Sequence, residues 1–234
     1  MAHRGNSARA PENTLAAFLR ALADGADLLE TDLHLTRDDV FVCIHDATLE
    51  RTGGVSLAVR DLTLDELKRH PVPCGRPEFA EERVPSLAEL AAILPPDRGL
   101  ALELKTDRFL EPDVCRRLAA ELRGAGVADR TAVLSFAFGR CLAVKREMPE
   151  VRAGLVTLKG ALPREGEAEM AGPFWPLLLL DPFYAWRAHR RGMFVAPLDE
   201  TPDRLLWYYR LVGCDVVLTN DPGETLRRLG RAAT

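Results

Sequence analysis

The sequence predicts an α/β fold, namely a TIM (β/α)8 barrel with a small insertion after the second strand. Short apolar runs alternate with stretches of helical periodicity along most of the 234 residues. Continuous apolar runs of this kind are typical of parallel strands that are buried on both faces. No Gly-x-Gly-x-x-Gly turn follows an early strand, which favours a barrel over an open doubly wound sheet.

Eight β/α units result when the opening tripeptide is counted as the stub of a first strand. The other seven expected strands are short hydrophobic runs at residues 28–35, 100–104, 131–134, 154–156, 177–180, 193–196 and 216–218. Between them, apolar residues recur three and four positions apart, as at Leu15, Phe18 and Leu22, which indicates helices. Further helices are expected over 139–148, 182–191 and 202–211.

Residues 47–84 interrupt this alternation because they are polar and contain several glycines and prolines. We therefore expect one catalytic domain over residues 1–234, with 47–84 as a small insertion. Within the insertion, Thr63 is a candidate cap for a short helix over 64–68. The helix that leads back to the barrel is expected to begin near Ser86.

Composition argues against several classes of protein. The net charge is −4 and the arginines are scattered among acidic residues, so we expect no nucleic-acid partner. The five cysteines are odd in number and widely spaced, which predicts free thiols rather than a disulfide framework. We expect no leader peptide and no membrane segment, and hence a cytoplasmic protein. The sequence carries no signal for an oligomeric state.

Three carboxylates fall within the expected strands. Glu30 and Asp32 are two positions apart and therefore point to one face, as do Glu103 and Lys105. Carboxylates gathered at a barrel mouth repel one another unless a cation lies between them, and hard oxygen ligands select Mg²⁺ or Ca²⁺. The alternative interpretation is that Glu30 and Asp32 are solvated strand-end residues that pair with arginines.

Two histidines and two cationic residues accompany these acids. His3 and His45 are both expected to end a strand at the same rim, and their ordinary pKa suits proton transfer near neutral pH. Arg4 and Lys105 supply positive charge for a phosphate group. Lys105 can equally serve as the counter-ion of Glu103, and the two roles are compatible.

Short motifs follow one another in a fixed order along nearly the whole chain. They are His3-Arg4-Gly5, Pro11-Glu12-Asn13-Thr14, Glu30-Thr31-Asp32, His45-Asp46, Leu49-Glu50-Arg51-Thr52, Pro85-Ser86-Leu87-Ala88-Glu89, Leu102-Glu103-Leu104-Lys105 and Leu218-Thr219-Asn220-Asp221-Pro222. By these motifs the sequence resembles the glycerophosphodiester phosphodiesterase family.

The resemblance implies the same barrel with its insertion, one divalent cation, and hydrolysis of a small glycerophosphodiester to glycerol 3-phosphate and an alcohol. It implies roles for seven residues, namely the metal ligands Glu30, Asp32 and Glu103, the acid/base pair His3 and His45, and the phosphate ligands Arg4 and Lys105. In a mechanism consistent with these groups, the glycerol 2-hydroxyl attacks phosphorus and water then opens the cyclic phosphate. We assign His3 as the base and His45 as the acid of the first step.

Two alternatives remain open from the sequence. The family commonly has a Trp-Thr-Val-Asn stretch after the seventh strand, where this chain reads Ala-Pro-Leu-Asp-Glu-Thr at 196–201. The missing tryptophan leaves room for a lipid tail, as in a lysophospholipase D-like enzyme. Aromatic residues that could form a replacement apolar wall are Phe136, Phe138, Phe183, Tyr184 and Trp186. The short first strand motivates the other alternative, a non-catalytic barrel that binds phosphate or metal.

Overall fold

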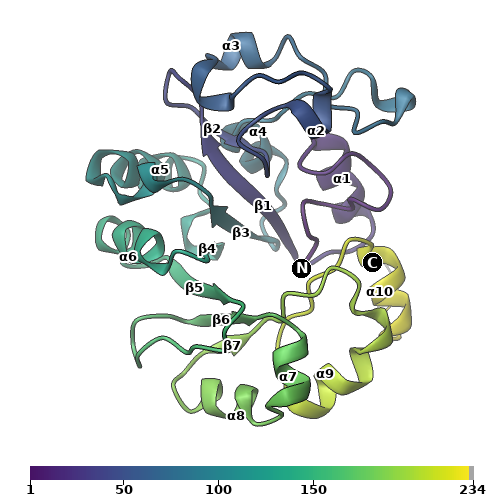
Figure 1. The fold of residues 1–234 in the computed structure, drawn as a ribbon, viewed down its shortest axis with the longest axis vertical. Coiled ribbons are helices and arrows are strands. Elements are labelled where there is room, and N and C mark those ends of the chain that lie inside the picture. Colours follow the sequence, from purple (N-terminus) through teal and green to yellow (C-terminus); the bar gives the residue numbers. More distant parts are fainter. Residues whose placement is uncertain (232–234) are drawn as a thin grey trace.

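One sheet runs through the computed structural model, which describes residues 1–231 (Figure 1). Its strands follow the order β2-β1-β3-β4-β5-β6-β7, and every neighbouring pair is parallel except β1 and β2. The strands are β1 (Leu28–Leu35), β2 (Phe41–Cys43), β3 (Gly99–Leu104), β4 (Thr131–Ser135), β5 (Arg152–Thr157), β6 (Met170–Pro173) and β7 (Phe194–Val195).

Two irregular segments close this sheet into a barrel. Ala2 forms parallel bridges to Leu29 in β1 on one side and to Thr219 on the other. The backbone N–H groups of residues 215 and 216 donate hydrogen bonds to the Val195 carbonyl in β7, at 2.9 and 3.2 Å. Together with the six parallel strands, these two segments make eight strand positions around the barrel, which confirms the predicted (β/α)8 barrel.

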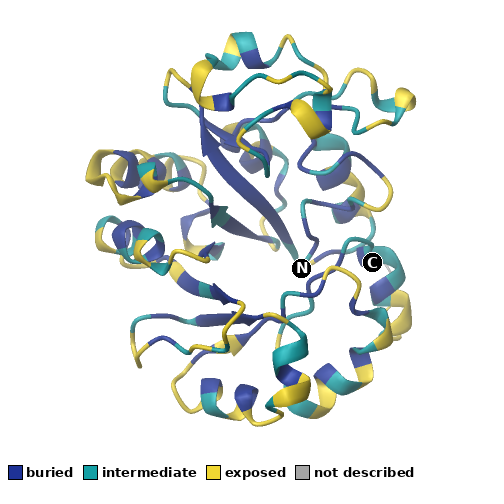
Figure 2. Cartoon of the chain, viewed as in Figure 1, coloured by how far each residue is buried: buried dark blue, intermediate teal, exposed yellow. Residues whose placement is uncertain are grey.

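Helices surround the barrel and turn their buried faces toward it (Figures 1 and 2). They are α1 (Leu15–Ala23), α2 (Glu50–Gly53), α3 (Leu64–Leu67), α4 (Leu87–Ile93), α5 (Pro112–Gly124), α6 (Phe138–Glu147), α7 (Pro176–Leu180), α8 (Tyr184–His189), α9 (Leu206–Val212) and α10 (Pro222–Arg228). Single 3₁₀ turns occur at Val59–Asp61, Pro77–Phe79, Asp107–Leu110, Ala128–Arg130 and Pro202–Arg204. Within residues 1–231, every helix is too short or too polar to span a lipid bilayer.

Residues 47–84 build a separate apolar cluster beside β2. The predicted caps are present, because Thr63 and Ser86 each form a reciprocal capping box with the glutamate three positions later. Thr63 starts α3, and Ser86 starts α4, which returns the chain to the barrel. The cluster consists of Val42, Ile44, Leu49, Val59, Leu67, Val72 and Val84. The insertion therefore has its own core, which holds it against the barrel at β2.

The expected strand at 177–180 is wrong. These leucines belong to helix α7, and the strand of this unit is β6, just before them. Pro176 occupies the first turn of α7, where its fixed φ suits a helix, and leucine is a strong helix former. The strand β6 reads Met-Ala-Gly-Pro and lacks the β-branched residues that signal a strand.

Two other expectations need adjustment. Residues 216–218 occupy the last strand position of the barrel. They are held there by isolated hydrogen bonds and do not form a regular strand. No sequence pattern predicted β2, which turns back from β1 and pairs with it antiparallel, with Cys43 opposite Leu33. The expected free thiols are confirmed, and Cys43, Cys115 and Cys141 are buried.

The outer core between sheet and helices is anchored by Phe109, which is fully buried and stacks on Phe41 with 5.9 Å between the ring centroids. Replacement Phe109→Ala should lower the free energy of unfolding by about 3–5 kcal/mol, because it removes a large buried ring and leaves a cavity. Chemical denaturation measures this value. Phe183, which is 69% exposed, is the matched control, and Phe183→Ala should cost less than about 0.5 kcal/mol. Equal effects for the two variants would contradict the assigned core.

Candidate active site

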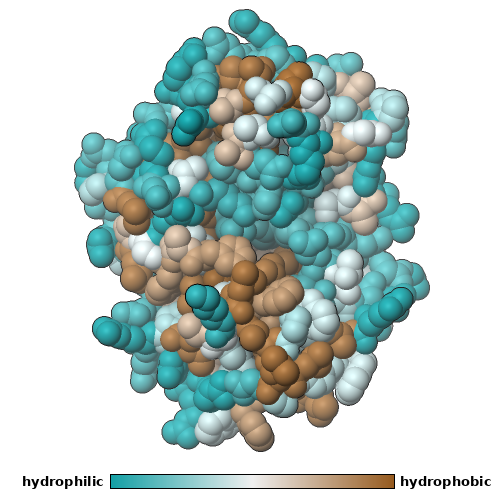
Figure 3. Space-filling view, in the orientation of Figure 1, coloured by the Kyte–Doolittle hydropathy of each residue, from teal (hydrophilic) through white to brown (hydrophobic). Residues whose placement is uncertain are grey.

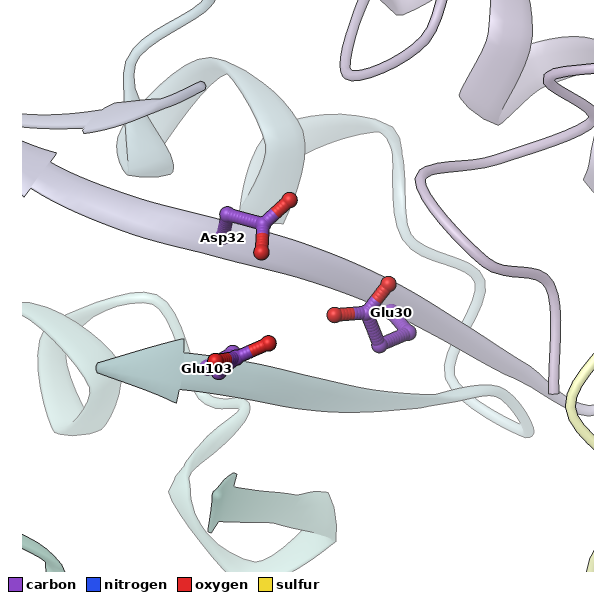
Figure 4. Close-up of side chains that lie close together, drawn as sticks. All are labelled: Glu30, Asp32 and Glu103. Atoms are coloured by element: carbon purple, nitrogen blue, oxygen red, sulfur yellow. The ribbon is translucent and has the colours of Figure 1, made fainter. Parts of the chain in front are cut away.

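Three carboxylates converge between β1 and β3. Glu30 and Asp32 lie on β1, and the parallel register places Asp32 directly beside Glu103 on β3. Figure 4 shows the three side chains turned toward one another in the space between the two strands. One oxygen from each residue lies within 4.8 Å of the others. The three carboxylates therefore lie together, as their spacing along the sequence predicted.

Burial and mutual repulsion make this cluster unfavourable when all three groups are ionised. Burial, together with the charges of Asp32 and Glu103, raises the pKa of Glu30 well above its ordinary value. Burial also raises the pKa of Glu103, since the ammonium of Lys105 offsets it only in part. Asp32 is buried too, but the charges of Arg4 and Lys105 hold its pKa below the ordinary value. A divalent cation would relieve this repulsion.

The donor set fits a hard cation. Asp32 Oδ1 is buried and accepts no hydrogen bond from any described residue, although Lys105 Nζ lies only 3.0 Å away. This contact is an ion pair, and because a carboxylate oxygen has two lone pairs, Oδ1 can accept a further ligand. Lys105 Nζ also lies 2.9 Å from Glu103 Oε1. Lys105 is therefore a counter-ion of two carboxylates, one of which was expected.

A strained turn aims Arg4 at the carboxylates. Arg4 has a φ of 54°, in the left-handed region, and its backbone N–H donates to Glu30 Oε2 at 3.0 Å. Gly5 follows with a φ of 80°, and a Cβ there would lie 2.6 Å from the Ala17 carbonyl carbon. The glycine of the His-Arg-Gly motif is thus required by the close approach of α1. The Arg4 guanidinium places Nε 3.0 Å from Asp32 Oδ2.

Asn13 is a site residue to which sequence reasoning gave no role. Its Nδ2 donates to Asp32 Oδ2 at 3.0 Å, and its Oδ1 accepts a hydrogen bond from Thr31 Oγ1 at 2.7 Å. Its φ of 55° is also left-handed. The signal was available, because Asn13 belongs to one of the motifs that carry the family resemblance. Spacing alone, however, does not connect Asn13 to Thr31 and Asp32, which lie 18 and 19 residues later.

The two histidines differ in burial and in hydrogen-bond partner. His3 is buried, and its Nδ1 lies 2.7 Å from Asn220 Oδ1. Burial and the neighbouring Arg4 lower the pKa of His3. His45 is a third exposed, and its Nδ1 donates to Asp46 Oδ1 at 2.6 Å. Among the described residues, neither ring uses Nε2 in a hydrogen bond.

The route by which His45 arrives differs from the prediction. It does not end a barrel strand at the rim, but follows β2, which runs antiparallel to β1 and brings the chain back to the level of Asp32. The Ile44 N–H donates to the Asp32 carbonyl at 2.9 Å and fixes this position. His34 supports the same turn, since its Nε2 lies 3.1 Å from the His45 carbonyl oxygen.

A hollow at the barrel mouth has one polar and one apolar side. Its lining comprises Met1, His3, Glu30, Glu103, Leu134, Val156, Met170, Gly172, Ala196, Leu198 and Leu218. In Figure 3, hydrophobic surface borders the central hollow on its lower side, and hydrophilic surface borders it above. The apolar side comes from β4, β5 and β6, from Ala196 and Leu198 after β7, and from Met1 and Leu218.

The aromatic residues that could form a replacement apolar wall do not line this hollow. Among the described residues around it, none is one of the five candidates. Phe136 comes directly after β4 and is half exposed. Phe138 is the first residue of α6 and packs against the core, and Tyr184 is the first residue of α8 and is buried. Phe183 and Trp186 lie exposed at α8. Aliphatic side chains form the apolar side instead.

Comparisons with known proteins agree with this geometry. The model of the glycerophosphoryl diester phosphodiesterase family matches residues 3–224. A glycerophosphodiester phosphodiesterase from Caldanaerobacter subterraneus subsp. tengcongensis is 33% identical over 240 residues, covering 99% of this chain and 97% of the relative.

Solved structures show the same fold. A phosphodiesterase from Oleispira antarctica, in complex with the product sn-glycerol-3-phosphate, superposes with a TM-score of 0.87 at 24% identity, covering 98% of this chain and 95% of the other. A glycerophosphodiester phosphodiesterase from Parabacteroides distasonis gives a TM-score of 0.81 at 25% identity, with coverages of 98% and 95%. By the family match, the high coverage and the shared barrel, the chain belongs to the glycerophosphoryl diester phosphodiesterase family of phosphoric diester hydrolases.

Proposed function

We propose that the protein hydrolyses glycerophosphodiesters to glycerol 3-phosphate and an alcohol, with one divalent cation, Mg²⁺ or Ca²⁺, and two histidines as acid and base. The observation that carries this proposal is the cluster of Glu30, Asp32 and Glu103. His3 lines the same hollow as Glu30 and Glu103, and His45 follows Ile44, whose N–H donates to the Asp32 carbonyl. Family membership supports the reaction, and the product held by the Oleispira antarctica relative is the product named here.

Glu30, Asp32 and Glu103 would hold the cation, and Asp32 Oδ1 is the oxygen most ready to do so. When bound, such a cation would supply Lewis acidity to the diester. Arg4 and Lys105, which now neutralise the carboxylates, would then be released from them. Both cations would then be free to orient the phosphate, Arg4 through its planar fork and Lys105 as a compact charge.

The two histidines would divide the proton transfers. His3 has a lowered pKa and is neutral at pH 7, so its Nε2 can accept the proton of the glycerol 2-hydroxyl as that oxygen forms a bond to phosphorus. His45 donates a proton from Nε2 to the departing alcohol oxygen as its bond to phosphorus breaks. Water then opens the cyclic phosphate with the histidine roles reversed.

The partner of His45 suits the acid role. Hydrogen bonds from Arg51 and His45 outweigh burial and lower the pKa of Asp46 to about 2. Asp46 therefore stays ionised at neutral pH and accepts the Nδ1 proton of His45, so that Nε2 is the nitrogen available to the departing oxygen. The partner of His3 is the neutral amide of Asn220, and this hydrogen bond offsets only in part the lowering of the His3 pKa by burial.

An assay of glycerol 3-phosphate release from glycerophosphocholine tests this function. Activity should require Mg²⁺ or Ca²⁺ and disappear on chelation, because the carboxylates cannot activate the substrate alone. His3→Ala and His45→Ala should each lower kcat by about 10²–10⁴-fold, the usual contribution of acid/base catalysis. Both variants should keep the wild-type circular dichroism spectrum. Activity that survives chelation, or that is untouched in both variants, would refute the mechanism.

Stability should respond to cation and pH together. In the cation-free protein the raised pKa values of Glu30 and Glu103 mean that protonation favours the folded state. This stabilisation is complete below the ordinary glutamate pKa of 4.5 and is lost as pH rises through the raised values. Cation binding needs the ionised forms, so the increase in Tm on adding Ca²⁺ should be larger near pH 8 than near pH 5.

Differential scanning fluorimetry with and without Ca²⁺ measures this increase. Glu103→Gln keeps the shape of the side chain and removes one charged ligand, so its Ca²⁺-dependent increase should be smaller at both pH values. An increase of equal size at both pH values in the wild type would argue against a cation site built from these carboxylates.

A second candidate function follows from the apolar side of the hollow, namely hydrolysis of a lysophospholipid whose glycerol carries one acyl chain. Leu134, Val156, Met170 and Leu198 share this hollow with the catalytic candidates. A chain on the glycerol 1-position would leave the 2-hydroxyl free to attack phosphorus. Burial of the first methylenes against these side chains would favour such a substrate by about 0.8 kcal/mol each.

Rates on 1-acyl glycerophosphocholines of increasing chain length, kept below micelle-forming concentrations, test this second function. If it holds, kcat/KM should rise about tenfold or more between glycerophosphocholine and a short acyl derivative. Leu198→Asn should cancel the rise while sparing glycerophosphocholine hydrolysis. Leu211→Asn, at a position 73% exposed on α9, is the control and should leave both rates unchanged. Rates that do not depend on chain length would rule this function out.

A further inference from the structure

A continuous chain of charged hydrogen bonds connects the two ends of the site. Arg4 Nη1 donates to Glu12 Oε1 at 3.0 Å. Both terminal nitrogens of Arg51 donate hydrogen bonds to the same carboxylate, at 2.7 and 2.8 Å. Arg51 Nε donates to Asp46 Oδ2 at 2.6 Å, and Asp46 Oδ1 accepts from His45. Arg4, which faces the carboxylates, and His45, the candidate acid, are thus joined by an unbroken series of hydrogen bonds.

We propose that Arg51 and Glu12 are positioning residues of the reaction, which act by fixing His45 and Arg4 relative to each other. This inference rests on the proposed function of His45 as the acid. Neither residue touches the hollow at the barrel mouth, and each reaches the reacting groups only through a neighbour.

The geometry is more specific than that of an ordinary surface ion pair. Arg51 uses all three of its nitrogens on two carboxylates, so its planar guanidinium sets the orientation of both. Glu12 lies between two guanidinium groups, and their hydrogen bonds and charges outweigh burial and lower its pKa. Glu12 is therefore a charged acceptor at neutral pH.

The chain of contacts also bridges two parts of the molecule. Glu12 precedes α1 of the barrel, whereas Arg51 lies on α2 of the insertion. Helix α2 is only one turn long, and its neighbour Leu49 is anchored in the apolar cluster of the insertion. That packing fixes the backbone of α2. The bidentate contact between Arg51 and Glu12 adds a direct side-chain link between the partner of His45 and the partner of Arg4.

Position matters here because the acid must face the leaving oxygen while the phosphate is held by Arg4. Displacement of a reacting group by 1 Å costs on the order of 10²-fold in rate. Asp46, held by Arg51 through one oxygen, presents the other to Nδ1 of His45 and so selects the tautomer with a proton on Nδ1. Nε2 is then left for exchange with the substrate.

Comparing kcat on substrates with two different leaving groups distinguishes a loss of positioning from general structural damage. Choline needs a proton to depart, whereas 4-nitrophenolate leaves without one. Arg51→Met keeps the length of the side chain and removes the charged fork. It should lower kcat on glycerophosphocholine by about 10–100-fold and lower kcat on glycerol 3-(4-nitrophenyl phosphate) by less than about threefold. Arg51→Lys should restore only part of the loss, because lysine offers no fork.

Glu12→Gln tests the other arm of the chain. It loosens Arg4, and it should therefore raise KM for both substrates as well as lower kcat for glycerophosphocholine. Arg37→Met is the matched control, because Arg37 also ties a barrel loop to the insertion, through Glu66, but contacts no member of the chain. Its kinetics should equal those of the wild type. Equal losses on both substrates in Arg51→Met would overturn the positioning role.

A readout that does not need activity keeps the inference separate from the proposed function. Nitrogen NMR of the His45 ring should report mainly the tautomer protonated at Nδ1 in the wild type and a loss of that preference in Arg51→Met, with Arg37→Met unchanged. If no diester is hydrolysed by the wild type, the proposed function fails while this spectrum still decides the positioning role. An unchanged tautomer in Arg51→Met would overturn it.

Discussion

Repulsion among three carboxylates, held together by the register of β1 and β3, is the constraint on which the rest of the site depends. The backbone of a parallel pair leaves no freedom to separate Asp32 from Glu103 once the strands are hydrogen bonded. Four neighbouring groups offset this negative charge. Arg4 and Lys105 supply positive charge, Asn13 donates an amide hydrogen, and the Arg4 backbone N–H turns toward Glu30.

The strained turns next to the site follow from the same constraint. Arg4 and Asn13 are two of four non-glycine residues with positive φ in residues 1–231, and both donate a hydrogen bond to a carboxylate of the cluster. A relaxed backbone would turn these donors away. Their conformational cost, of order 1–3 kcal/mol each, is offset by the hydrogen bonds to buried charge. The close packing of Gly5 on α1 holds this turn in place.

Sequence reasoning succeeded where a local pattern maps directly onto geometry, and failed where tertiary contacts decide. The two-residue spacing of Glu30 and Asp32 was sufficient to place them on one face, and the capping boxes at Thr63 and Ser86 were readable. The leucines of α7 were misassigned because a short apolar run has no decisive period. The contacts of Asn13 and Arg51 span many residues, and only the folded chain brings them together.

The unequal surroundings of the two histidines argue that they are not interchangeable. His3 is buried against a neutral amide, in a place where a permanent positive charge would be costly beside Arg4. His45 is more exposed and shares its proton with a carboxylate that stays ionised because Arg51 holds it. A neutral ring in the first setting suits the proposed base, and a ring whose Nδ1 is bound to a carboxylate suits the proposed acid. In the proposed mechanism the two roles therefore follow from the partner of each Nδ1, and the insertion contributes Arg51 to the surroundings of His45.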